Sequence, residues 1–381
     1  MNNHSIDNKA IGDRVRNLRN AWTLTQKQLA EVLHLRNAQT VSYIENGTRA
    51  LRAYELAILT EYFHLSVGEL LNSQQKPAVT VQWRSSVNNT RVAQEEAQFL
   101  KRCHNYSYVE SVTNSTATDR VPQKTDFHPT LTKYETVSEW ARHTRNTLDL
   151  GDTPALSLQG TLAREWGVKI FWDNLECGSA ACVKDSFGAG VLLNATEPYW
   201  RQNFSLGHEL FHLMTWNVSS VIDSLPKIAG KRNETLAEIF SSSLLMPEES
   251  LRIEFNRLID DGKIRWFDLM MLARRYSVST IALLWRLANL GLMDKSVPRL
   301  FESSDELKSI DKDLDRDDEP ESKALPQRYI SLAYKAYNDG EISIGKLAHL
   351  LETTIGELDI VLADYGIDLN SDVYETTLST S

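Results

Sequence analysis

The stretch "FSLGHELFHLMTW", residues 204–216, contains two histidines four positions apart, and a glutamate directly follows the first. On a helix of 3.6 residues per turn, His208 and His212 stack one turn apart, on the side opposite three leucines. Glu209 then projects near the histidine face. Two converging imidazoles beside a carboxylate are what a zinc-dependent hydrolase needs to hold Zn²⁺ and supply a general base. The alternative is that both histidines are ordinary core residues.

A catalytic zinc ion takes three protein ligands, so a third must come from elsewhere in the chain. The stretch "NETLAEIFSSSLLMP", residues 233–247, has helical periodicity and ends at Pro247. It places Glu234 and Glu238 on one face and apolar residues on the other. Either glutamate could supply the third ligand, and we favour Glu234.

Length and composition place the chain among ordinary globular proteins. Its 381 residues suffice for two or three domains, with 42% hydrophobic and 24% charged residues. Three cysteines and a polar N-terminus without an apolar run predict a cytoplasmic protein. No apolar stretch approaches the roughly 18 residues of a membrane helix, so we expect no membrane contact. A net charge of −10 argues against a protein that coats nucleic acid by charge alone.

The first 75 residues predict short helices joined by tight turns. Thr25 and Gln28 have capping-box spacing, Asn37 can cap the next helix, and Gly47 can end it. The second and third helices are then arranged as a helix-turn-helix, whose third helix would enter the DNA major groove.

The remainder of the chain predicts a mostly α-helical protein with a small β-sheet, an α+β fold. Strands are expected within "VTVQWRSS" (79–86), "VKIFWD" (168–173) and "GAGVLLN" (188–194). Helices are expected within 91–103, 134–150 and 156–167, and again over 325–367. The segment "SSDELKSIDKDLDRDDEPE" (303–321) is densely acidic and predicts an unpacked linker. The expected units are a DNA-binding head (1–75), a connecting region (76–132), a metallopeptidase domain (133–302), an acidic linker (303–324) and a small helical C-terminal module (325–381), for which docking is favoured over DNA contact.

"LTQKQLA" (24–30) and "VSYIENG" (41–47) make the head similar to the XRE family, the lambda-repressor-like DNA-binding domains. His34 stands where that family usually has glycine. The resemblance implies a double-stranded DNA operator as partner, bound most simply by a homodimer. It implies these DNA-contacting residues: Gln26 on a phosphate, Asn37, Gln39, Thr40 and Tyr43 at the groove, and Arg49 near the backbone. The alternative is a helical dimerisation module that does not bind DNA.

Residues 204–216 and 233–247 together resemble the ImmA/IrrE family of zinc metallopeptidases, which has a zincin-like fold. Besides the His-Glu-x-x-His pattern, Glu234, Ala237, Phe240 and "LLMP" (244–247) match the family's second motif in register. The resemblance covers roughly 160 residues. It implies that His208, His212 and Glu234 bind Zn²⁺, or Mn²⁺ in its place, and that Glu209 is the general base. Glu238 replaces the usual asparagine, and Phe211 replaces a common glycine.

Together these resemblances predict a DNA-binding regulator that relieves repression, in a stress response or in mobile-element control, by cutting a repressor protein. Two alternatives stay open. The metal domain could sense a signal without proteolysis, or the chain could be a toxin–antitoxin component.

Overall fold

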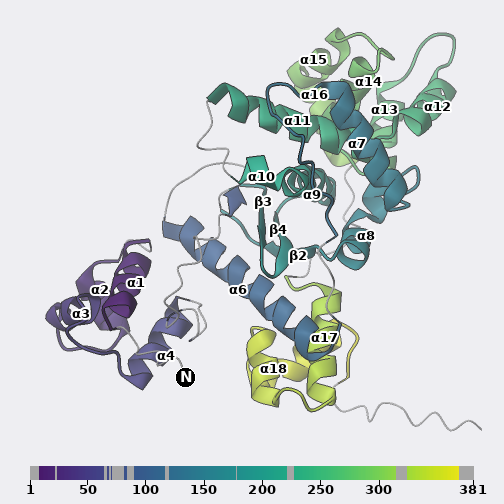
Figure 1. The fold of residues 1–381 in the computed structure, drawn as a ribbon. Coiled ribbons are helices and arrows are strands. Elements are labelled where there is room, and N and C mark those ends of the chain that lie inside the picture. Colours follow the sequence, from purple (N-terminus) through teal and green to yellow (C-terminus); the bar gives the residue numbers. More distant parts are fainter. Residues whose placement is uncertain are drawn as a thin grey trace, which may run out of the picture.

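A computed structural model describes residues 8–21, 24–63, 67, 70, 81–83, 90–115, 120–176, 178–220, 227–314 and 324–368. Over these residues the protein is mostly helical with one four-stranded sheet (Figure 1). The expected α+β fold is therefore confirmed.

The head consists of short helices around an apolar cluster of its own, which includes Val15, Leu29 and Leu59. Its helices are α1 (Asn8–Ala21), α2 (Gln26–Val32), α3 (Ala38–Glu45) and α4 (Ala53–Tyr62). The predicted capping box opens α2, and Asn37 caps α3 by accepting a hydrogen bond from the backbone N–H of Thr40 at 3.1 Å. The turn before α3 needs a left-handed residue, and His34 adopts φ of +53° there.

The sheet forms the centre of the middle unit, with strand order β1-β3-β4-β2. Its strands are β1 (Gln82–Trp83), β2 (Lys169–Asp173), β3 (Ala180–Asp185) and β4 (Gly188–Asn194). The β3–β4 hairpin is antiparallel, β1 joins β3 antiparallel, and β2 lies parallel to β4. Period-2 alternation divides the strands: Ala180 and Cys182 face one apolar cluster, whereas Ala181 and Val183 face another.

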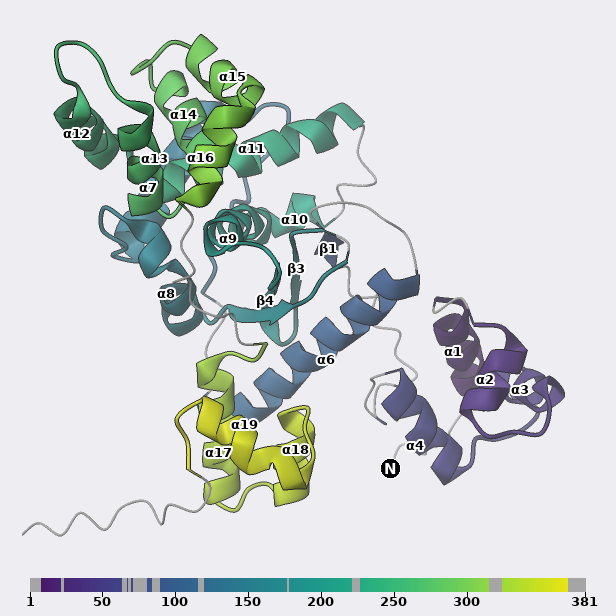
Figure 2. The same cartoon turned by 180° about the vertical axis from the view of Figure 1, so that it is seen from behind.

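Helices cover both faces of this sheet. The cluster on the first face includes Leu206 and Leu210 of α9 (Tyr199–Met214). The cluster on the second face includes Phe99 and Tyr106 of α6 (Thr90–Val112) and Tyr329 of α17 (Gln327–Asn338). Figure 2 shows α9 on one side of β3 and β4, with α6 and α17 on the other. The helix with the His-Glu-x-x-His pattern is thus held between the sheet and further helices.

The remaining helices of the middle unit pack around α9, and α8 contacts strand β2 as well. They are η1 (Pro154–Leu156), α7 (Tyr134–Thr147), α8 (Leu158–Glu165), α10 (Trp216–Ser219), α11 (Lys227–Leu245), α12 (Glu248–Leu258), α13 (Trp266–Arg275), α14 (Thr280–Asn289), α15 (Ser296–Ser303) and α16 (Asp305–Asp313). In this layer α11 packs against both α9 and α7.

Two segments pack more extensively than their expected roles imply. Residues 76–132 are more than a connection, because β1 extends the sheet and α6 covers one of its faces. The acidic segment does not begin as an unpacked linker: residues 305–313 form α16, and Leu307 and Leu314 pack against the main cluster. Arg274 pairs with Asp311 and so fixes this helix. Residues 315–323 of the expected linker lie outside the described residues.

The C-terminal helices α17, α18 (Ile344–Leu350), η3 (Ile355–Glu357) and α19 (Leu358–Asp364) dock on α6 and the second sheet face. Arg102 of α6 is largely buried, donates to both carboxylate oxygens of Glu352 at 2.9 and 2.7 Å, and pairs with Asp173 at 3.0 Å. The module is therefore attached by both apolar and ionic contacts. No helix among the described residues is long and apolar enough to cross a membrane.

Candidate metal centre

Three side chains of metal-binding type converge between α9 and α11. His208 Nε2 lies 3.1 Å from His212 Nε2 and 3.1 Å from Glu234 Oε2, and His212 Nε2 lies 3.6 Å from Glu234 Oε1. Among the His, Cys, Asp and Glu side chains of the described residues, these three come together, with all their ligand atoms within 4.8 Å of one another. The structure thus brings Glu234, and not Glu238, to the histidine pair.

Close packing of α9 on α11 produces this convergence. A Cβ built on Gly207 would lie 2.6 Å from Ser241 Oγ and 3.2 Å from Ser241 Cβ, so the two helices touch where residue 207 has no side chain. Ser241 Oγ also donates to the carbonyl oxygen of Phe204 at 2.8 Å. His208 directly follows Gly207 on α9, and Glu234 lies about two turns before Ser241 on α11; with the helices packed this closely, the two side chains meet at 3.1 Å.

A buried polar network orients His212. Its Nδ1 lies 3.2 Å from Ser219 Oγ and 3.4 Å from Asn233 Nδ2, and Ser219 in turn lies 2.9 Å from Thr215 Oγ1. Ser219 and Asn233 are fully buried. Because this network holds Nδ1, the opposite ring nitrogen, Nε2, is directed toward His208 and Glu234. Hydrogen bonds to the second ring nitrogen orient metal-binding histidines in the same way. The residues of this network were not identified from the sequence. The one feature that could have indicated them is that Ser, Asn and Thr occupy helix positions that face the protein interior.

The donor set fits a divalent cation. Two imidazole nitrogens and one carboxylate form the protein ligands of a catalytic zinc site that keeps one position open. The histidine side chains are 2% and 7% exposed, whereas that of Glu234 is 48% exposed, so the group opens to solvent on the glutamate side. Desolvation raises the pKa of Glu234, but hydrogen bonds from His208 and His212 outweigh it and hold that pKa well below its usual range. The carboxylate is therefore in the ionised form that binds cations.

Glu209 is buried on the sheet side of α9, directly after His208. It is hydrogen-bonded to the thiol of Cys182 on β3. Burial, together with the negative charge of Glu209, raises the pKa of Cys182 well above its usual value, so this cysteine stays a neutral thiol. Cys182 is a buried core residue outside the three-residue group. Cys177 lies outside the described residues.

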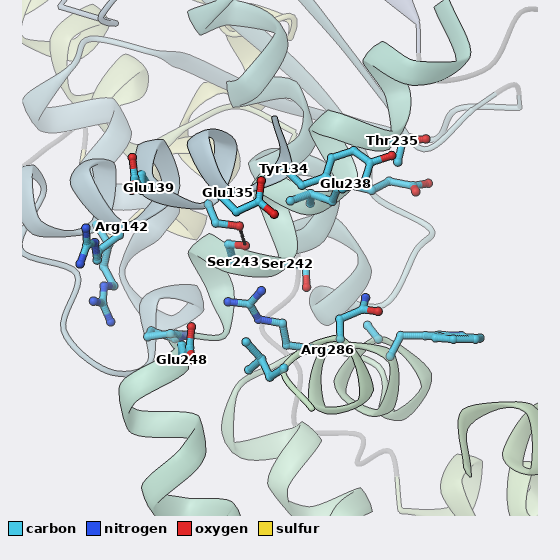
Figure 3. Close-up of a pocket in the computed structure, with 18 of the residues that line it drawn as sticks. Tyr134, Glu135, Glu139, Arg142, Thr235, Glu238, Ser242, Ser243, Glu248 and Arg286 are labelled. Carbon is cyan, nitrogen blue, oxygen red and sulfur yellow. Dashed lines mark hydrogen bonds between the residues drawn. The ribbon is translucent and has the colours of Figure 1, made fainter. Parts of the chain in front are cut away.

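Glu238 lines a cavity of about 930 Å³ in place of joining the group. This cavity lies between α7, α11 and α14, and Figure 3 shows Glu238 together with Glu135 and Thr235 at one of its ends. The histidines and Glu234 are not among the residues that line it.

The groove-facing residues expected in the head fall into two kinds. Asn37 and Thr40 are used in the cap of α3, where Thr40 Oγ1 also donates to Asn37 Oδ1 at 2.9 Å. Gln39 and Tyr43 are exposed, one turn apart on α3. The outward surface of α3 therefore presents Gln39 and Tyr43.

The two residues expected near the DNA backbone are engaged with buried carboxylates. Gln26 Nε2 donates to Glu45 at 2.8 Å, and Arg49 forms a bidentate pair with Glu55 at 2.9 and 2.7 Å. Burial raises the pKa of Glu45 and of Glu55, but hydrogen bonds from their partners reverse this and lower both. These contacts stabilise the helix arrangement of the head in the absence of DNA.

Comparison with known proteins supports a partial assignment. No curated protein matches the chain. A solved structure, described as a Mycobacterium tuberculosis transcriptional regulator, is 16% identical and has a TM-score of 0.32; the match covers 48% of this chain and 51% of that one, about half of its length. The family described as the IrrE N-terminal-like domain (Peptidase_M78) matches residues 175–288, which contain α9 and α11. The middle of this chain is therefore similar to a metallopeptidase-like domain of the IrrE type.

Proposed function

We propose that the protein is a DNA-binding regulator whose middle domain is a metal-dependent endopeptidase that cuts a repressor protein. The observation that carries this proposal is the convergence of His208, His212 and Glu234, with the buried Glu209 directly after His208 on α9. The match of residues 175–288 to a peptidase-type family supports it.

In this proposal His208, His212 and Glu234 hold one Zn²⁺, or Mn²⁺ in its place. A bound divalent cation supplies a Lewis acid that polarises the scissile carbonyl. Glu209 accepts a proton from the attacking water and later donates it to the leaving amine. The Ser219–Asn233 contacts fix the orientation of His212 throughout, because they hold its Nδ1 from the side away from the group.

The head would direct this activity to a particular operator. The exposed Gln39 and Tyr43 support the proposal, since they stand on the helix that would enter the major groove. A glutamine amide at this place pairs with adenine through two hydrogen bonds. A short two-fold symmetric site bound by a homodimer in the cytoplasm is the simplest arrangement. Cutting a repressor would then relieve repression of the controlled promoter.

The decisive test replaces Glu209 by glutamine, which has nearly the same shape but cannot accept the proton. Purified wild type and Glu209→Gln, each with zinc, are incubated with the repressors encoded beside the gene, and fragments are sought. We expect cleavage by wild type and a loss of turnover of at least about 10²-fold in the variant. Metal content and DNA affinity should stay near wild type.

The same variant separates proteolysis from sensing. In cells, wild type should shorten the repressor and raise promoter expression after the inducing stress, and Glu209→Gln should do neither. Induction by the variant with a full-length repressor would show that the metal domain acts as a sensor.

A further inference from the structure

The cavity of about 930 Å³ lies directly along the helices from the metal group. Phe204, which lines it, precedes His208 by one turn of α9, and Glu238 follows Glu234 by one turn of α11. Four residues of α-helix span about 6 Å along the axis. The volume falls in the range of ligand pockets, which is roughly 300–1,000 Å³. A chain bound across the metal group would therefore continue into this cavity.

Among the described residues, two arginines that line the cavity, Arg142 and Arg286, form no ion pair with a carboxylate; Arg142 is exposed, whereas Arg286 is largely desolvated, with Glu248 and Glu249 near enough to act on it electrostatically. Figure 3 shows the Arg286 side chain extending from α14 toward Ser242 and Ser243 of α11. Among the described residues, its hydrogen bond is the one that Nε donates to the carbonyl oxygen of Met246 at 3.3 Å. Burial lowers the pKa of Arg286 to about 10, which still leaves it charged at neutral pH. A partly desolvated guanidinium with free donors is stabilised by an anion that enters the cavity.

The other charges of the cavity wall are paired or exposed. Arg145 pairs with Glu249 at 3.5 Å, and Glu248 pairs with Arg252 at 2.7 Å. Three further glutamates at the wall have exposed side chains, namely Glu135, Glu139 and Glu238. These carboxylates would repel a polyanion such as a nucleotide. A polypeptide that is neutral or basic overall and carries one carboxylate would not be repelled.

We propose that this cavity binds the polypeptide substrate on one side of the metal group, and that Arg286 pairs with the carboxylate of an aspartate or glutamate in that polypeptide. The exposed glutamates then face basic residues that flank the acidic one. Arg286 is in this view a specificity-determining residue, and the inference rests on the proposed peptidase function.

The test measures binding, so that it does not depend on turnover. The host is the full-length Glu209→Gln protein with zinc. The probes are fluorescein-labelled octapeptides of alanine and serine with a lysine at each end, in which one glutamate is moved through the six inner positions. A matched series carries glutamine instead. By fluorescence anisotropy we expect glutamate to bind about tenfold tighter than glutamine at one or two positions, the range for a charge-assisted hydrogen bond.

Two variants in the same host assign that preference. Arg286→Gln should remove it, and Arg286→Lys should retain part of it, because the charge stays while the planar fork is lost. Arg257→Gln is the matched control: it makes the same charge change at a 68% exposed position of α12, outside the cavity, and should keep the preference in full. Thermal melting of each variant shows whether it is folded.

The outcomes are distinct. Equal binding of the glutamate and glutamine series at every position would overturn the proposal even if Arg286→Gln fails to fold. A preference that survives in a folded Arg286→Gln would remove this residue from the site. If N-acetylglutamate N-methylamide binds as tightly as the best peptide, the cavity takes a small acid and not a polypeptide. If the glutamate preference depends on Arg286 but wild type cleaves none of the repressors encoded beside the gene, the peptidase function is refuted. The binding site in the cavity is then still supported.

Discussion

The contact between α9 and α11 at Gly207 determines how closely the histidine pair approaches Glu234, and Gly207→Ala tests this directly. The new Cβ would meet Ser241 Oγ at 2.6 Å, Ser241 Cβ at 3.2 Å and Ser241 Cα at 3.3 Å. Rotation of the serine relieves the first contact but not the other two, so the helices must move apart by a few tenths of an ångström. Overpacking of this kind costs about 2 kcal/mol. The better helix propensity of alanine returns about 1 kcal/mol.

We therefore expect Gly207→Ala to lower the free energy of unfolding by about 1 kcal/mol in metal-free buffer. Zinc affinity should fall by about tenfold or more, as when an outer contact of a metal site is lost. In the Ser241→Gly background the contacts with Oγ and Cβ are absent and the 3.3 Å contact with the backbone Cα remains, so the propensity gain should outweigh what is left of the overpacking. There Gly207→Ala should stabilise the protein by up to about 1 kcal/mol, and this reversal of sign is the sharpest part of the prediction.

The assay combines calorimetric unfolding of the four proteins of this double-mutant cycle with zinc competition against a chromogenic chelator. Ser241→Gly alone serves as the reference for the double variant, since it also removes the hydrogen bond to Phe204. If Gly207→Ala has the same effect on stability and on zinc affinity in both backgrounds, the contact with Ser241 does not set the geometry of the group.

Three further predictions concern the metal, the operator and the C-terminal module. His212→Ala should abolish stoichiometric metal, since two donors remain of three; unchanged metal by elemental analysis would show that the site is elsewhere. Gln39→Ala should weaken binding to the specific operator by about 1–3 kcal/mol and leave binding to random DNA nearly unchanged, whereas equal losses on both would remove Gln39 from the base-reading residues. Glu352→Gln should weaken docking of the C-terminal helices by about 1–2 kcal/mol, because the buried Arg102 loses a charged partner. Faster amide hydrogen exchange over α17 and α18 would be the sign of this, and unchanged exchange would contradict it.

Short-range sequence patterns were sufficient to predict features that lie within a single helix, strand or turn. The capping box at Thr25, the cap at Asn37 and the strands β2 and β4 follow from short-range patterns, and the structure has them. The strand β3 was not expected, because "AACVKD" is rich in small residues and lacks the alternation of a typical strand. Its residues become a strand through pairing with β4 on one edge and β1 on the other.

Segment roles were less predictable than segment types. The acidic segment around α16 looked unable to pack, yet Leu307 and Leu314 are partly buried against a surface that the sequence around them does not reveal. The helix in the supposed connecting region was expected, but its place on the sheet depends on Phe99 and Tyr106 meeting strand residues some 70 positions later. Such contacts are decided by surface complementarity between distant segments.

The sequence by itself determined the two helix faces that form the candidate site, one with the histidines and one with the glutamates. The four-residue spacing of His208 and His212 places both imidazoles on one face of any helix, because the helical period is 3.6 residues. It also placed Glu234 and Glu238 together on one face of the following helix, and here local geometry could not choose between them. The tertiary structure made that choice: α9 and α11 approach closely at Gly207, and this register brings Glu234 to the histidines and leaves Glu238 in the neighbouring cavity. Periodicity fixes which residues share a face, but only the packing of two helices fixes which of them meet.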